Sequence, residues 1–119
     1  MEKVNLAEKF GQINEHWSPK IAGELNDAYI KLAKLEGEFL WHRHDAEDEM
    51  FLVVKGSLTI RFRDRDILLG EGEFLIIPKG VEHMPVAEQE VWVMLIESKT
   101  TRNTGEVQNE RTVETLDWV

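Results

Sequence analysis

Two histidines one residue apart, His42 and His44, precede an acidic cluster and then a run of large apolar side chains. Side chains two residues apart on a β-strand point to the same side, so we expect the two imidazoles to face a common point. Glu49 has the strand parity of Phe51 and Val53, which indicates an inward-facing position. An inward carboxylate costs several kcal/mol unless it is paired or bound to a cation. The pattern therefore predicts a cation site at the mouth of a strand.

A third histidine, His83, lies much further along the chain, directly after a turn signal in the stretch PKGVEHMP. Together the four residues would offer three imidazole nitrogens and one carboxylate oxygen. Such a set suits a divalent first-row metal such as Fe, Mn, Co, Ni, Cu or Zn. Glu47 shares the parity of Glu49 and is the alternative carboxylate ligand if the intervening loop is shorter than expected. We interpret the other acidic residues of the cluster DAEDE as a solvated loop.

The composition argues against several other kinds of chemistry. The 119 residues include no cysteine, which excludes disulfides, thiolate metal sites and cysteine nucleophiles. A net charge of −9 would repel a phosphate backbone, so we expect no nucleic-acid partner. No Ser/His/Asp triad or phosphate-cradling glycine loop is apparent. The N-terminus lacks the apolar core of a signal peptide, and no apolar run approaches the roughly 20 residues of a membrane helix, so we expect a cytoplasmic protein without a membrane partner.

Short apolar runs separated by Gly, Pro, Asp and Lys fill about residues 28–97, which predicts many short strands and hence a sandwich or barrel. The clearest strands are expected at residues 50–54, 58–63, 67–69, 74–78 and 91–97. The stretch 26–37 has the Asn/Asp start and closing Gly37 of a helix, but it also fits a strand. We favour the strand because the residues that follow need an extended chain.

The two ends of the chain are predicted to be an N-terminal arm (1–27) and a C-terminal tail (98–119) on a single domain. The arm is expected to contain a short helical turn at residues 5–10, capped by Asn5. The tail begins as a polar loop and ends in apolar residues, which we expect to dock on the body or on a partner subunit. Residues 91–97 are apolar on both faces, so the outer face should meet a second subunit or an N-terminal segment.

Two separated motifs in this chain resemble those of the cupin family. The first motif comprises Gly37, the HRH of residues 42–44, Glu49 and Gly56; the second comprises Gly72, Pro78, Gly80 and His83. The chain departs from the family pattern at two positions, because Gly37 lies one residue closer to His42 than usual and Ala87 replaces the Asn that typically ends the second motif. Neither departure affects a ligand position.

The resemblance implies an all-β fold, the double-stranded β-helix or jelly-roll barrel, with its core at about residues 28–97. It implies that the metal ligands are His42, His44, Glu49 and His83. The chain is most similar to the stand-alone, single-domain cupins of bacteria, which commonly form dimers. A homodimer that binds a small-molecule ligand is therefore expected.

Several functions remain compatible with this ligand set. A six-coordinate Fe, Mn or Ni ion would keep two positions open, and a net site charge of +1 would favour enolates, carboxylates and vicinal diols. We place a dioxygenase-like enzyme first and a sugar or keto-enol isomerase second. A non-catalytic ligand-binding or sensing module is a further alternative, because no general acid or base is evident beyond the ligands. Tetrahedral Zn would close the shell, which favours a metal-stabilised structural dimer.

Overall fold

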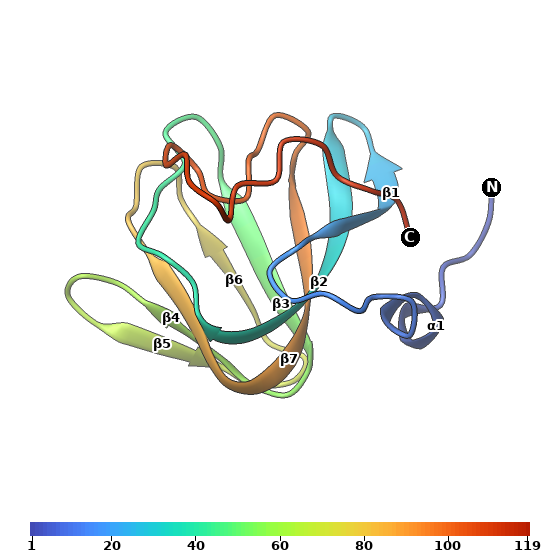
Figure 1. Ribbon diagram of the computed structural model, residues 1–119, viewed down its shortest axis with the longest axis horizontal. Coiled ribbons are helices and arrows are strands. Elements are labelled where there is room, and N and C mark those ends of the chain that lie inside the picture. The colour runs from blue at the N-terminus through green and yellow to red at the C-terminus, as the bar shows by residue number, and fades with distance from the viewer.

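The computed structural model describes all residues 1–119 and contains seven strands and one short helix (Figure 1). The elements are, in chain order, α1 (Leu6–Phe10), β1 (Lys20–Leu25), β2 (Ala28–Glu38), β3 (Glu49–Lys55), β4 (Leu58–Arg61), β5 (Asp66–Leu69), β6 (Phe74–Ile77) and β7 (Met84–Ser98). Every strand expected from the apolar runs is present, and the ambiguous stretch 26–37 forms most of β2 rather than a helix. No helix has the length and apolarity that a membrane crossing requires.

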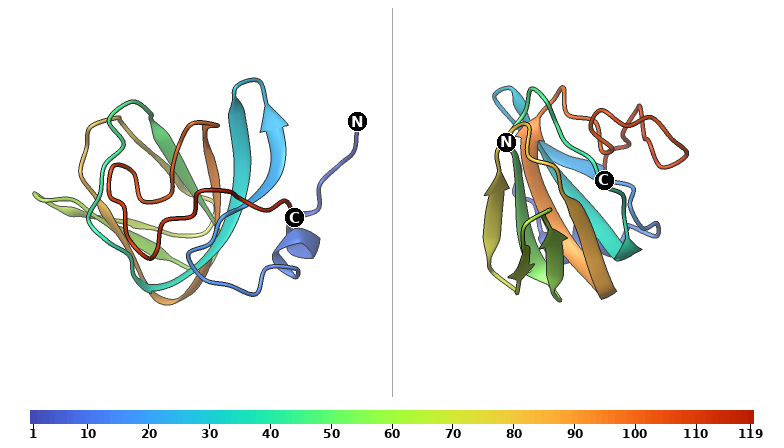
Figure 2. Two further views of the ribbon diagram at one scale, coloured as in Figure 1. Left: turned by 45° about the horizontal axis from the view of Figure 1, so that its top comes forward. Right: turned by 90° about the vertical axis from the view of Figure 1, so that its left-hand side faces the viewer.

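All strands belong to one antiparallel sheet that curls into a barrel. Its main path has the order β1-β2-β7-β3-β6, and β4 pairs with β5 and with β7. β7 is 15 residues long; its beginning pairs with β4, and its later residues pair with both β2 and β3. One long strand thereby contributes to both walls of the barrel (Figure 2). This arrangement confirms the all-β jelly-roll fold expected from the sequence.

One apolar cluster of 12 buried residues fills the barrel interior. Alternation along β7 points Val91, Val93 and Leu95 inward, and alternation along β4 does the same for Leu58 and Ile60. These inward side chains come from strands on both walls, so burial of the cluster holds the walls together. The rigid frame formed in this way carries the polar groups at its open end.

The fourth strand is shorter than the sequence predicted. β4 ends at Arg61, not at residue 63, because the chain turns back at residues 62–65. The Phe62 amide donates to the Arg65 carbonyl at 2.8 Å, which closes this turn. Phe62 is consequently only half-buried, although it still packs against the core as its parity predicted.

The N-terminal segment covers part of the outer face of the sheet. α1 begins after Asn5, whose side-chain oxygen accepts the Glu8 amide at 3.0 Å, as the predicted cap requires. Phe10 is fully buried and stacks on Trp92 of β7 with ring centroids 4.8 Å apart. Together with Leu32 of β2, these contacts form a second, smaller apolar cluster. The N-terminal arm is thus one of the two covers expected for this face.

The rest of that outer face is partly exposed to solvent. Antiparallel register aligns its apolar side chains in two cross-strand rows, which are Ile76–Met50–Ile96 and Phe74–Leu52–Met94. Phe74 and Ile76 lie on the terminal strand β6 and are each 56% exposed. An apolar surface of this kind is the usual mark of an interaction site.

The chain termini extend the sheet beyond the predicted core. β1 was not expected from the sequence, yet it pairs with β2 along its length. The end of the C-terminal tail lies along β1, where the Ile21 amide donates to the Asp117 carbonyl at 2.9 Å and the Val119 amide donates to the Ile21 carbonyl at 3.0 Å. The tail was expected to dock on the body of its own chain or on a partner subunit, and in this structure it docks on the body.

Candidate metal centre

Two chain segments far apart in the sequence are joined at one end of the barrel. His42 and His83 face each other across a pair of backbone hydrogen bonds, with N···O distances of 3.0 and 2.9 Å. The Gly80 amide also donates to the His44 carbonyl at 2.8 Å. These bonds fix the HRH segment against the turn that precedes β7. Glu49, the first residue of β3, completes the site from an adjacent strand.

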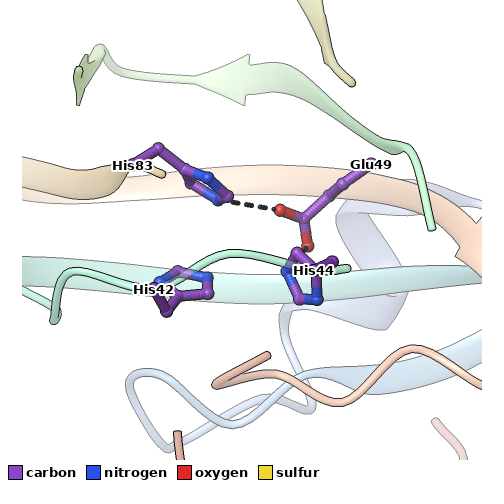
Figure 3. Close-up of side chains that lie close together, drawn as sticks. All are labelled: His42, His44, Glu49 and His83. Carbon is purple, nitrogen blue, oxygen red and sulfur yellow. Dashed lines mark hydrogen bonds and ion pairs between the residues drawn. The ribbon is translucent and has the colours of Figure 1, made fainter. Parts of the chain in front are cut away.

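The four side chains converge on one point inside the barrel (Figure 3). One potential ligand atom from each of His42, His44, Glu49 and His83 lies within 4.8 Å of all the others. All four side chains are buried, at no more than 4% exposure. Glu49 is central, because its Oε1 lies 3.2 Å from His83 Nε2 and its Oε2 lies 3.4 Å from His44 Nε2.

Hydrogen bonds outside this group orient two of the imidazoles. The Nδ1 atoms of His42 and His83 lie 2.9 Å from the carbonyl oxygens of Leu40 and Val81, respectively. A carbonyl can only accept, so Nδ1 donates in both rings and Nε2 is the ring nitrogen that faces the site, where a cation would bind. His44 Nε2 is buried with no hydrogen-bond partner. The donor set and this unsatisfied nitrogen both fit a divalent transition metal.

The ionisation of these residues reflects their burial and mutual contacts. Burial, followed by the nearby His83, lowers the pKa of His42 to about 4. Burial also acts to lower the pKa of His44, but contact with Glu49 outweighs it and the pKa is raised. Burial acts to raise the pKa of Glu49, yet its contacts with His44 and His83 hold that pKa well below the usual range. The carboxylate is therefore available as an anionic ligand.

The alternative carboxylate lies outside this group. Glu47 Oε2 accepts a hydrogen bond from Thr100 Oγ1 at 3.1 Å, and Glu47 is not among the converging residues. Within the loop that we interpreted as solvated, Asp48 has a structural contact, since its Oδ1 accepts the Lys79 amide at 2.9 Å. That bond joins the loop before β3 to the turn that carries the second motif.

A small cavity of about 40 Å³ adjoins the four residues. Its wall is largely apolar, with Leu35, Phe51 and Leu95 from three strands, and both His42 and Glu49 line it. A buried water needs about 10–15 Å³ by this measure, so the cavity has room for roughly three. A space of this size admits only a very small molecule.

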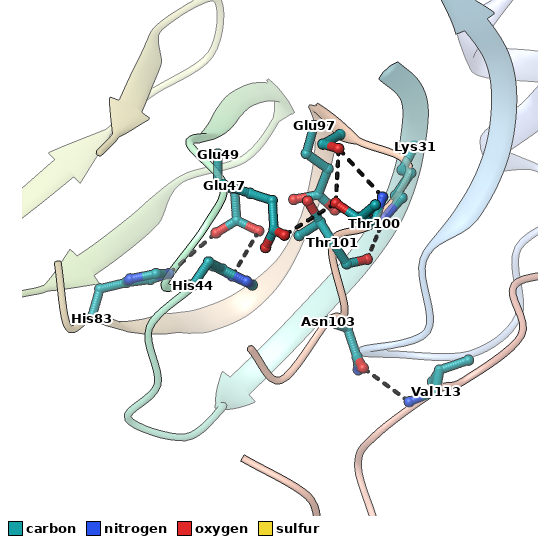
Figure 4. Close-up of polar contacts among 11 residues, drawn as sticks. Lys31, His44, Glu47, Glu49, His83, Glu97, Thr100, Thr101, Asn103 and Val113 are labelled. Atoms are coloured by element: carbon teal, nitrogen blue, oxygen red, sulfur yellow. Dashed lines mark hydrogen bonds and ion pairs between the residues drawn. The ribbon is translucent and has the colours of Figure 1, made fainter. Parts of the chain in front are cut away.

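Sequence reasoning missed a buried ion pair beside the centre (Figure 4). Glu97, near the end of β7, lines the cavity, and its Oε1 accepts from Lys31 Nζ at 2.8 Å. Burial, together with the charge of Glu49, raises the pKa of Glu97 well above the usual range. Besides the four ligands, the cavity is thus lined by a further ionisable side chain that the sequence analysis did not identify. The signal was available, because Glu97 has the inward parity of Leu95.

A C-terminal cover, residues 101–113, lies across the open end of the barrel (Figure 2). It is bound to the HRH segment by the Glu106 amide, which donates to the Arg43 carbonyl at 3.1 Å. Gly105 has a φ of +60°, and a Cβ at this position would lie 3.3 Å from the His42 ring. Thr104 is fully buried, and Arg111 donates to the Glu38 carbonyl at 2.8 Å. The cover thus excludes solvent from the centre.

Residues 28–97 match the family described as the cupin domain. The chain belongs to this family. It is 36% identical over 80 residues to the uncharacterized protein YdbB of Bacillus subtilis (strain 168), which covers 66% of this chain and 71% of YdbB. The expected resemblance is thereby confirmed for the part of the chain that carries both motifs.

Solved structures support the same assignment for this cupin. A cupin-2 domain-containing protein from Shewanella frigidimarina NCIMB 400 is 50% identical, with a TM-score of 0.80 over 81% of this chain and 94% of that one. Protein NMB1881 from Neisseria meningitidis is 32% identical, with a TM-score of 0.76 over 82% of this chain and all of that one. KdgF from Halomonas sp. is 22% identical with a TM-score of 0.62, over 70% of this chain and 78% of KdgF, and it shares the fold alone.

Proposed function

We propose that this cupin is a metal-dependent enzyme of dioxygenase type that acts on a small chelating molecule. The observation that carries the proposal is the small, largely apolar cavity that is lined by His42 and Glu49, two of the four buried metal-ligand side chains. A purely structural metal site has no need of an adjoining cavity. A small apolar space beside the ligands suits a diatomic or a short chelating molecule that must be kept from bulk water.

Different residues would have different roles at such a site. His42, His44, Glu49 and His83 would hold the metal, which when bound supplies a Lewis-acidic or redox-active centre. The carbonyl bonds to Nδ1 keep two of the rings in the orientation that presents Nε2. The apolar wall positions the carbon skeleton of the ligand, and the C-terminal cover excludes water.

Elemental analysis of untagged protein, followed by oxygen-uptake assays, tests this proposal. We expect near-stoichiometric Fe, Mn or Ni in the wild type and loss of the metal in Glu49→Ala. Oxygen consumption should then depend on a chelating substrate and on the metal. Stoichiometric Zn without turnover would favour the metal-stabilised structural alternative, and ligand-induced thermal stabilisation without product would favour a binding or sensing module. No metal after reloading would refute the metal centre itself.

A keto-enol or sugar isomerase is the second candidate, and Glu97 favours it. This buried carboxylate lines the same cavity, and its Oε2, which has no hydrogen-bond partner, could accept a proton from a substrate. The two enzyme classes differ in a simple observable. An isomerase should exchange a substrate C–H proton with deuterated solvent under anaerobic conditions, whereas an oxygenase should show no turnover without oxygen.

We also propose that the protein works as a cytoplasmic homodimer. The partly exposed rows Ile76–Met50–Ile96 and Phe74–Leu52–Met94 support this assembly, because an apolar sheet face can pair with its own copy about a two-fold axis. The terminal strand β6 also has one unpaired edge at the border of this surface.

A further inference from the structure

Glu97 has one oxygen with a fixed partner and one without. Its Oε1 accepts from Lys31 Nζ at 2.8 Å, and Lys31 also donates to the Thr101 carbonyl at 3.3 Å. Both charged side chains are 2% exposed. Glu97 Oε2, by contrast, is buried with no hydrogen-bond partner. Leaving a buried acceptor unpaired is unfavourable, so a bound molecule that donates a hydrogen bond to it is favoured.

The surroundings restrict which molecule can do so. Glu97 lines the same cavity as Glu49 and His42, and the apolar side chains of Leu35 and Phe51 line it as well. A hydroxyl group can donate to Oε2, whereas a carbonyl or ether oxygen in the same place would face it with lone pairs only. The cavity therefore distinguishes a hydroxyl from an oxo group on an otherwise identical small molecule.

The charge balance indicates the remaining functional group. Lys31 neutralises Glu97, so the centre contains the single uncompensated carboxylate of Glu49. A divalent ion would leave this region with a net charge of +1, which a second carboxylate from the ligand would neutralise. The small volume limits the rest of the molecule to a short apolar chain.

We propose that Glu97 is a specificity-determining residue that selects short 2-hydroxy acids over 2-oxo acids of the same size. The inference rests on the proposed function, since the metal centre holds the acid group of the ligand. Leu35, Phe51 and Leu95 contact its carbon chain, and Glu97 Oε2 accepts its hydroxyl proton in a hydrogen bond. Lys31 holds Glu97 in place and leaves Oε2 free.

Calorimetric titration with lactate and pyruvate tests this selection, because the two acids have the same skeleton and differ in the hydroxyl or oxo group. The protein is loaded with Ni(II), so that binding rather than turnover is measured. We expect the wild type to bind lactate about tenfold or more tightly than pyruvate, the range of a hydrogen bond to a charged group. In Glu97→Gln the preference should fall to about twofold or less, because an amide can donate as well as accept.

Two further variants and the metal content keep the outcomes distinct. Glu47→Gln makes the same charge change outside the cavity and should retain the preference. Lys31→Met/Glu97→Gln removes both charges, so it avoids an unpaired buried lysine and should lose the preference as well. A lactate preference that survives in either Glu97 variant overturns the selection, and so does equal or undetectable binding of both acids to nickel-loaded wild type. Loss of nickel only in Glu97 variants would instead make Glu97 a metal-site residue, and failure of the wild type to load would refute the proposed function itself.

Discussion

Replacing Gly105 by Ala tests how the C-terminal cover closes the metal centre. An added Cβ would lie 2.1 Å from the Arg43 carbonyl oxygen, so the cover must move by about 1 Å to relieve the overlap. The hydrogen bond from the Glu106 amide to the same oxygen would be lost, which costs about 1 kcal/mol. Ala at the left-handed φ of +60° costs about 1–2 kcal/mol more. We expect Gly105→Ala to lower the unfolding free energy by about 3 kcal/mol in total, which lowers Tm by about 12 °C for a chain of this size.

Gly72→Ala is a matched control for this experiment. Gly72 has a φ of +80°, but an added Cβ there would meet no atom within 4 Å. Gly72→Ala should therefore show the effect of backbone strain alone, a loss of about 1 kcal/mol in unfolding free energy and of about 4 °C in Tm. Thermal unfolding gives the stability, and release of Co(II) or Ni(II) to a colorimetric chelator gives access to the centre. Release should be about tenfold or more faster in Gly105→Ala than in the control. Equal Tm values and equal release rates in the two variants would refute the cover as the closing element.

Three other predictions follow from the same structure. His44→Ala should abolish metal retention in elemental analysis, whereas Glu47→Ala should retain it. In metal-free protein the pKa of His42 falls from 6.5 in the unfolded chain to about 4 in the folded one, so between these pH values the unfolded chain binds a proton that the folded chain does not. About 3 kcal/mol of unfolding free energy that is present above pH 6.5 should therefore be lost as the pH falls to 4. His42→Asn should flatten this pH dependence in denaturant titrations. Phe74→Lys/Ile76→Lys should convert a dimer into a monomer in analytical ultracentrifugation with little change in Tm, and a wild type that is already monomeric would contradict the assembly.

The sequence predicted the barrel and the converging side chains because both depend on local periodicity. Alternation specifies which face of each strand is buried, and the i, i+2 spacing of His42 and His44 specifies that they share a side. Glu47 has the same parity as Glu49, so parity alone did not separate the two carboxylates; the structure places Glu49, the first choice, in the converging group. Whether these residues bind a metal in solution stays a prediction.

Features that depend on tertiary contacts were out of reach of this reasoning. β1 lacks a strong alternating pattern, and it is a strand because β2 and the C-terminal residues lie on either side of it. The cover has a polar sequence typical of a loop, and tertiary contacts such as the hydrogen bond from Glu106 to Arg43 and the close approach of Gly105 to Arg43 place it over the centre. Glu97 was missed for a different reason: its inward parity was visible in the sequence, but a lone acidic residue at the end of an apolar run is usually solvated.

Lys31 connects Glu97 with the C-terminal cover, two of the features that were not predicted from the sequence. Its ammonium group donates to Glu97 Oε1 inside the barrel and to the Thr101 carbonyl of the cover. Because an ammonium group has three donors and this one is almost fully buried, losing the Thr101 contact would leave a buried donor to be satisfied by water or by Glu97. Movement of the cover would therefore change the hydrogen bonding of the carboxylate that lines the cavity. We therefore expect Lys31 to couple movement of the cover, which admits a ligand, to the hydrogen bonding of Glu97, which binds it.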